Sequence, residues 1–250
     1  MEFMNLRSGE AFSMGKGRNW RIIHPDMGAE WITLNHGLHG AGNEFVQHVH
    51  DESDDIIVVL TGSVSLRQGE RYTKALAGEA IWIQAGEVHG TLNDSGGEVK
   101  MVSFQSPPDR ALYRGDRNKE ERERPRPRSD HASSVLVVRM SSGGADFRQV
   151  CDWRRVFSPA NGSRRMILEY GELSAGQSIE IEKEPYEGLV IVLEGDAHFT
   201  VAGKAQAAQH RLSAEDLVFF RTGEGGRFDC LRGSATLLHC ASLGLEGGNP

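Results

Sequence analysis

Several common classes of protein are excluded by what this sequence lacks. Its three cysteines, Cys151, Cys230 and Cys240, are odd in number and widely spaced, which does not suit a disulfide framework or a zinc cluster. No apolar run approaches the roughly 18 residues that a membrane span needs. The first residues also lack the apolar core and cleavage site of a secretory signal. We therefore expect a soluble protein of a reducing, cytoplasmic compartment with no membrane partner.

Positive charge is also scarce. The chain has 28 Lys and Arg against 35 Asp and Glu, a formal net charge of -7. Proteins that bind nucleic acid usually carry a basic excess, so we expect no nucleic-acid partner. The same charge is ordinary for a cytosolic protein and says little about a substrate.

Glycine, in contrast, is plentiful, with 30 residues among 250. Short runs of apolar and β-branched residues separated by glycine turns indicate strands, and no long 3.6-residue period competes with them in the first half. Strands spaced eight to twelve residues apart are typical of an all-β sandwich or barrel. The strands we expect in the first half cover residues 20–23, 31–34, 56–60, 64–66, 72–75, 80–83 and 99–104.

The composition changes between residues 106 and 134, where apolar residues almost disappear and arginines, acids and prolines are mixed. Such a segment cannot build a core of its own, so it indicates a linker or a surface excursion. A docking segment for an acidic partner is an alternative, although the interleaved acids cancel most of the charge.

The second half of the chain repeats the first. The segment at 189–199, LVIVLEGDAHF, aligns with IIVVLTGSVSL at 56–66, and EDLVFFRTGEGG at 215–226 aligns with GEAIWIQAGEVH at 78–89. A near-constant offset indicates two copies of one β-domain. We therefore predict a first domain at 1–106, a charged linker at 107–134 and a second domain at 135–250.

Four residues of the first copy are candidate metal ligands. His48 and His50 are two residues apart, so on a strand both face the same side. Asp55 follows after a short turn, and His89 lies near the start of another strand. Imidazole nitrogens with one carboxylate suit Mn, Fe, Co, Ni, Cu or Zn, and in an octahedral ion they leave two positions open. Taken alone, however, two such histidines are also common on a protein surface.

The two stretches that hold these residues resemble the paired motifs of the cupin superfamily. Gly42 is followed by His48 and His50, Asp55 and Gly62 at the family's first-motif spacing, and Gly78 is followed by Gly86, His89 and Asn93 at the spacing of the second. Asp55 stands where the family usually has Glu, and Gln84 where it has Pro.

The resemblance implies an all-β protein of two tandem cupin barrels, that is, double-stranded β-helix or jelly-roll barrels, known as a bicupin. It also implies that His48, His50, Asp55 and His89 bind one divalent transition metal ion, either Fe, Mn, Ni, Co or Zn. Asp54 is an alternative to Asp55, but its spacing is worse and it would point to the opposite face.

The second copy loses these ligands in the sequence alignment. Glu182 and Glu184 stand at the two histidine positions of the first motif, and Gly226 stands at the position of His89. We expect a degenerate domain without metal, while two glutamates leave a hard cation such as Ca²⁺ or Mg²⁺ as the alternative.

Function is less constrained than fold. By strand alternation Glu44 shares the face of His48 and His50, which makes it a candidate catalytic residue as a proton shuttle. A salt-bridge partner at the rim of the site is the alternative. The resemblance implies a metal-dependent enzyme acting on a small oxygen-rich or carbonyl substrate, and we expect a dioxygenase-type oxidoreductase. The alternatives are an isomerase or decarboxylase acting on a keto acid or sugar derivative, and a non-catalytic protein that binds a small ligand. Exposed sheet edges are also compatible with a homodimer.

Overall fold

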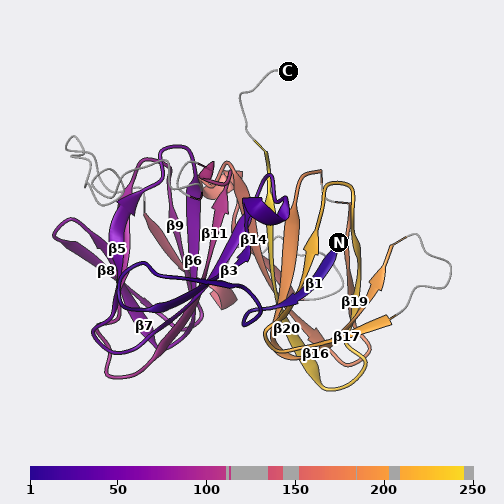
Figure 1. The fold of residues 1–250 in the computed structure, drawn as a ribbon. Helices are drawn as coiled ribbons and strands as arrows, with labels where there is room; N and C mark the ends of the chain where they lie inside the picture. The colour runs from indigo at the N-terminus through magenta and orange to yellow at the C-terminus, as the bar shows by residue number, and fades with distance from the viewer. Residues whose placement is uncertain (111–112, 114–134, 143–151, 184, 203–208, 245–250) are drawn as a thin grey trace. The chain divides into compact units, whose positions relative to one another are not determined.

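The computed structural model describes residues 1–110, 113, 135–142, 152–183, 185–202 and 209–244. The chain divides into two compact units (Figure 1). The first unit is Gly9–Arg139, and the second unit consists of Met1–Ser8 with Met140–Pro250. Most of the predicted linker at 107–134 lies outside the described residues. No helix in the described ranges is long and apolar enough to cross a membrane.

The first unit consists of two antiparallel sheets. One sheet has the strand order β5-β10-β7-β8, and the other has the order β12-β9-β6-β11-β4-β3-β2. A short 3-10 helix, η1, Pro25–Met27, connects β3 to β4. The strands are β2 Glu10–Phe12, β3 Arg18–Ile23, β4 Thr33–His39, β5 Glu44–Val49, β6 Asp54–Thr61, β7 Ser63–Gln68, β8 Arg71–Leu76, β9 Glu79–Ile83, β10 Val88–Leu92, β11 Val99–Ser106 and β12 Leu136–Arg139.

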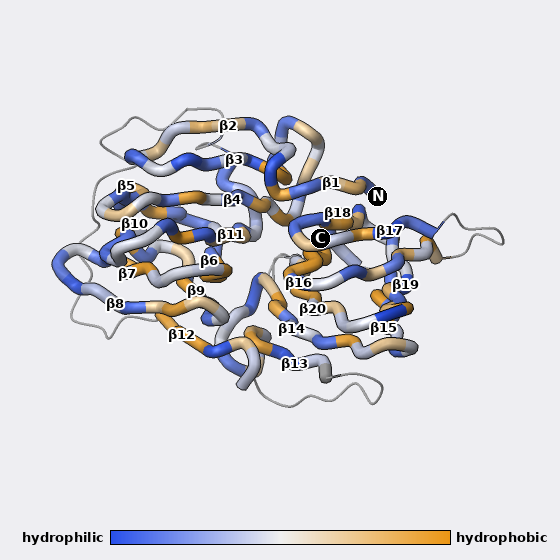
Figure 2. The backbone as a smooth tube through the Cα atoms, turned by 90° about the horizontal axis from the view of Figure 1, so that it is seen from below, coloured by the Kyte–Doolittle hydropathy of each residue, from blue (hydrophilic) through white to orange (hydrophobic). Residues whose placement is uncertain are grey.

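The core of this unit follows from the alternation of residues along its strands. Ile57 and Val59 of β6 face inward with Ile81 and Ile83 of β9, and all four side chains are buried. Apolar stretches lie along β6 and β9 in the hydropathy view (Figure 2). Because successive side chains of a strand alternate in direction, one apolar face is enough to close the two sheets over a common interior.

The second unit repeats this architecture around one long strand. The strand β16, Gly188–Val201, pairs with β18 and β20 along its first half and with β17 and β19 along its second half. It therefore covers the positions that β6 and β7 divide between them in the first unit. Its other elements are β1 Glu2–Asn5, η2 Met140–Ser142, β13 Asp152–Phe157, η3 Pro159–Asn161, β14 Met166–Ser174, β15 Ser178–Ile181, β17 Gln209–Ser213, β18 Asp216–Phe220, β19 Gly226–Asp229 and β20 Ser234–Ser242.

The predicted fold class is confirmed: the chain is all-β, with two tandem jelly-roll barrels. Two short segments belong to a unit that their place in the chain does not predict. The strand β1 pairs with β18 of the second unit, and β12 pairs with β9 of the first unit. Sheet pairing, which the local sequence does not record, decides both placements.

Candidate metal centre

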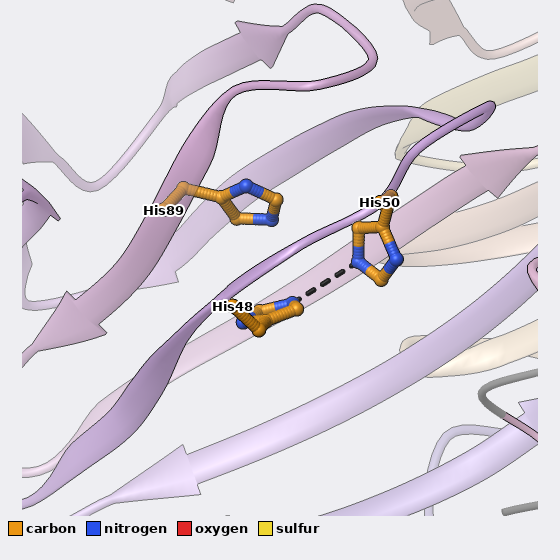
Figure 3. A group of neighbouring side chains, drawn as sticks. All are labelled: His48, His50 and His89. Carbon is orange, nitrogen blue, oxygen red and sulfur yellow. Dashed lines mark hydrogen bonds between the residues drawn. The ribbon is translucent and has the colours of Figure 1, made fainter. Parts of the chain in front are cut away.

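Three of the four predicted ligands form a buried cluster in the first unit. His48 lies on β5 and faces His89 across the pairing of β5 with β10, while His50 lies just beyond the end of β5. Their ligand nitrogens all lie within 4.8 Å of one another. His89 projects from its own strand toward the other two rings (Figure 3).

Backbone carbonyls determine the tautomers of two of these rings. The Nδ1–H group of His48 donates to the carbonyl of Val46 at 2.9 Å, and that of His89 donates to the carbonyl of Glu87 at 2.9 Å. A carbonyl oxygen only accepts, so each ring must carry its proton on Nδ1. Both Nε2 atoms are left with a free lone pair, which is the arrangement that metal-binding histidines usually show.

Two residues at the end of β11 and beyond it contact the ring of His50. Its Nδ1 lies 3.6 Å from Oδ2 of Asp109, and its Nε2 accepts a hydrogen bond from the side-chain amide of Gln105 at 3.0 Å. Nε2 of His50 therefore carries a lone pair, and it faces Nε2 of His48 at 3.0 Å. Two lone pairs that face each other are stabilised by a cation between them. Adjacent ligands of an octahedral ion with bonds of about 2.1 Å are also separated by about 3 Å.

The carboxylate of Asp55 is the fourth candidate ligand. Its Oδ2 lies 3.2 Å from Nε2 of His89, and its side chain is buried. Asp54 serves another role, because its carboxylate accepts from the backbone N–H of Ala85 at 3.0 Å and from the indole of Trp82 at 3.4 Å. These bonds tie Asp54 to the turn after β9. Three imidazoles and one carboxylate form a donor set that fits one divalent transition metal ion.

Burial keeps one of these histidines neutral. Desolvation lowers the pKa of His48 well below its usual value, and the nearby rings of His89 and His50 lower that pKa further. A neutral imidazole is the form that binds a metal, so the ring is ready to act as a ligand at neutral pH.

The structure does not bring Glu44 to the histidines. A β-bulge places two residues of β5 opposite Gly90 of β10, between the pairs His48–His89 and Phe45–Thr91. The bulge shifts the alternation by one residue, so Phe45 lines the cavity together with His48. The carboxylate of Glu44 lies 3.6 Å from Nη1 of Arg67, and the Glu44 side chain is 43% exposed.

A cavity of about 50 Å³ adjoins the candidate ligands. Its apolar lining includes Phe45, Ile57 and Met101. Its polar lining was not predicted from the sequence, although the alternating polar residues on β4 and β11 were a signal for it. These polar residues are Asn19, Asn35, His36, His39, Thr91, Ser103 and Gln105. Burial lowers the pKa of His39 to about 4, so this ring is also neutral at pH 7.

The second unit lacks two of the candidate ligands of the first. Gly226 pairs with Ile181, just as His89 pairs with His48. Ile181 rather than Glu182 therefore stands at the position of His48, and Glu182 is exposed. The alignment by sequence was shifted by one residue because the second unit has no counterpart of the β5 bulge in this pairing. Glu184 lies outside the described residues.

Comparisons with known proteins agree with the geometry of the first unit. Residues 36–104 match the family model described as Cupin domain. No curated protein sequence matches the chain.

Solved structures of oxalate decarboxylase resemble the whole chain. A mutant of the Bacillus subtilis enzyme OxdC is 11% identical with a TM-score of 0.71, and the match covers 96% of this chain and 77% of that one. A second structure of the Bacillus subtilis enzyme, which has Mn(II) centres, is 11% identical with a TM-score of 0.68 and the same coverage. At this identity the likeness establishes the fold.

Proposed function

We propose that the first unit, whose residues 36–104 match the Cupin domain model, is a metal-dependent enzyme acting on a small oxygen-rich or carbonyl substrate. The proposed ligands are His48, His50, Asp55 and His89. The observation that carries the proposal is the 3.0 Å approach of two imidazole lone pairs, on His48 and His50, beside a small cavity.

A divalent transition metal ion at this site would supply Lewis acidity or a place for O2. The protein supplies a small cavity with hydrogen-bonding groups. A water molecule needs about 10–15 Å³ of such space, so a cavity of this size has room for about three to five water-sized groups. This size supports a substrate of few non-hydrogen atoms.

Among the described residues that line the cavity, the only acid is Asp55, and there is no Lys, Arg or Tyr. Glu44, the residue expected to move protons, is paired with Arg67 instead. Isomerisation depends on a positioned acid or base, whereas an oxidation by O2 depends less on one. His39 also lines the cavity, but burial lowers its pKa to about 4, so this ring is not a charged acid at pH 7. The lining therefore supports a dioxygenase-type oxidoreductase.

A decarboxylase is the second candidate. The fold is shared with oxalate decarboxylases at 11–12% identity. Release of CO2 without consumption of O2 would identify this chemistry.

The first test measures metal and gas exchange together. We expect the protein to bind about one Fe(II) or Mn(II) ion per chain, and we expect His48→Ala to weaken that binding at least about 100-fold because it removes a ligand. His198→Ala, in the second unit, is the matched control and should bind metal normally.

Oxygen uptake and CO2 release are then recorded with a panel of small carbonyl compounds. Uptake of O2 supports the dioxygenase, and anaerobic release of CO2 supports the decarboxylase. A protein that binds no metal, or a His48→Ala variant that binds it normally, contradicts the proposal.

A further inference from the structure

Gln105 occupies a central position in the cavity that no motif identifies. It lies on β11, where it pairs with Asp55 of β6 on one side and with Thr33 of β4 on the other. Its side chain lines the cavity and is 5% exposed. A glutamine buried this deeply normally has partners for both atoms of its amide.

Only one of these atoms has such a partner among the described residues. The amide Nε2 donates to Nε2 of His50 at 3.0 Å. The amide oxygen Oε1 is buried and accepts no hydrogen bond from a described residue. Leaving a buried acceptor unsatisfied is costly, which indicates that a bound molecule donates to it.

A metal ion would displace this hydrogen bond between Gln105 and His50. The lone pair of His50 Nε2 can serve the Gln105 amide or an ion, but it cannot serve both. Once that lone pair is used, the amide N–H needs another acceptor in the same cavity. Both ends of the Gln105 amide then face the bound molecule, one as a donor and the other as an acceptor.

We propose that Gln105 orients the substrate of this site and selects an α-hydroxycarbonyl compound, or its enediol form, over a dicarboxylate. The inference rests on the proposed metal-dependent function. A carbonyl oxygen accepts the amide N–H, and the adjacent hydroxyl donates to Oε1. A primary amide presents a donor beside an acceptor, and an α-hydroxycarbonyl presents the complementary pair.

Hydrogen bonding separates the α-hydroxycarbonyl class from the dicarboxylates. The described lining includes the acid Asp55 and contains no Lys or Arg. The bound metal ion would balance the charge of a dicarboxylate, so charge alone does not decide between the two classes. Because the oxygens of a dicarboxylate only accept, it would leave Oε1 of Gln105 without a donor. A neutral hydroxycarbonyl avoids this cost.

The test compares two ligands on the Mn(II)-loaded protein by calorimetry. Hydroxyacetone represents the α-hydroxycarbonyl class, and oxalate represents the dicarboxylates. Wild type should bind hydroxyacetone more tightly than oxalate. In Gln105→Met, which has similar length without the amide, hydroxyacetone binding should weaken roughly 10- to 100-fold, the range expected when a buried polar contact is lost.

Metal binding is measured first in every variant. The Mn(II) affinity of Gln105→Met should stay within about threefold of wild type, because Gln105 is proposed to contact the substrate and not to hold the ion. Gln84→Met is the matched control, since Gln84 is exposed, and it should bind both ligands like wild type.

Three outcomes overturn the inference. Unchanged hydroxyacetone binding in Gln105→Met would remove the proposed contact. Loss of Mn(II) from that variant would show that Gln105 supports the metal ligands and does not act on the substrate alone. Tighter binding of oxalate than of hydroxyacetone by wild type would reverse the substrate class. A wild-type protein that binds no Mn(II) would instead contradict the proposed function itself, so the two failures are distinguishable.

Discussion

At the scale of single residues, neighbouring hydrogen bonds assign roles that sequence spacing leaves open. Asp54 and Asp55 are adjacent and both buried, so composition and burial do not separate them. Asp54 accepts from the N–H of Ala85 and from the indole of Trp82, while Asp55 lies against His89. Adjacent residues of a strand point to opposite faces, which explains why one carboxylate supports a turn and the other faces the cavity.

A pair of variants tests this division. Asp55→Ala should weaken Mn(II) binding about tenfold or more and leave the fold nearly as stable. Asp54→Ala should lower the free energy of unfolding by about 1–3 kcal/mol, because it leaves a buried indole N–H and a part-buried backbone N–H unsatisfied, with a smaller effect on metal binding. Calorimetric titration and urea unfolding measure the two effects. If Asp54→Ala is the variant that releases the ion, the assignment of Asp55 as ligand is wrong.

At the scale of elements, the bulge in β5 determines which side chains reach the cavity. Gly90 lies opposite the bulge, and a Cβ atom there would come within 2.7 Å of the carbonyl oxygen of Phe45 and 2.9 Å of the backbone N of Gln47. Both contacts are with backbone, which cannot rotate away. The close approach of β10 to β5 therefore depends on glycine at this position.

Gly90→Ala should displace β5 and move His48 with it. We expect a loss of about 1–3 kcal/mol in the free energy of unfolding, as for other overpacked sites, together with at least a tenfold weaker Mn(II) affinity. Gly96→Ala is the control, because a Cβ at Gly96 meets no atom within 4 Å. Equal behaviour of the two variants in thermal unfolding and metal titration would show that the bulge does not position His48.

At the scale of the whole molecule, equivalent positions line a cavity in the first unit and form a hydrogen-bond network in the second. Asn35 pairs with Ser103 on β11 and Arg21 on β3, and Glu169 pairs in the same way with His239 and Arg155. In the second unit these residues form a closed network, in which Glu169 accepts from His239 at 3.0 Å and from Arg155 at 2.9 Å. The hydrogen bonds and charge of His239, opposed by burial, lower the pKa of Glu169 to about 2.

Trp153 fills part of the interior of the second unit next to this network. It stands opposite Gly171, as Asn19 stands opposite Gly37, and its ring is buried over that glycine. Trp153→Ala should lower the free energy of unfolding by about 3–5 kcal/mol through the cavity that it leaves, while the metal content stays at one ion per chain. Urea unfolding and metal analysis test this, and loss of metal from the variant would contradict the separate roles of the two units.

Much of the fold was predictable from local sequence. Short continuous apolar runs at 56–60 and 80–83 predicted β6 and β9, and the near-constant offset between the halves predicted a repeated barrel. The spacing of His48 and His50 within glycine-bounded motifs also pointed to the place where the structure brings them together with His89. These features are local, because strand period and turn residues depend on neighbours along the chain.

Tertiary structure alone decided the rest. The β5 bulge moved Glu44 out of the cavity and shifted the second-unit alignment from Glu182 to Ile181, and neither effect is visible where only one strand is considered. Gln105, Asn35 and Ser103 became cavity residues through the pairing of β11 with β4 and β6. The physical reason is that side-chain period is a property of one strand, whereas register and bulges are properties of a pair.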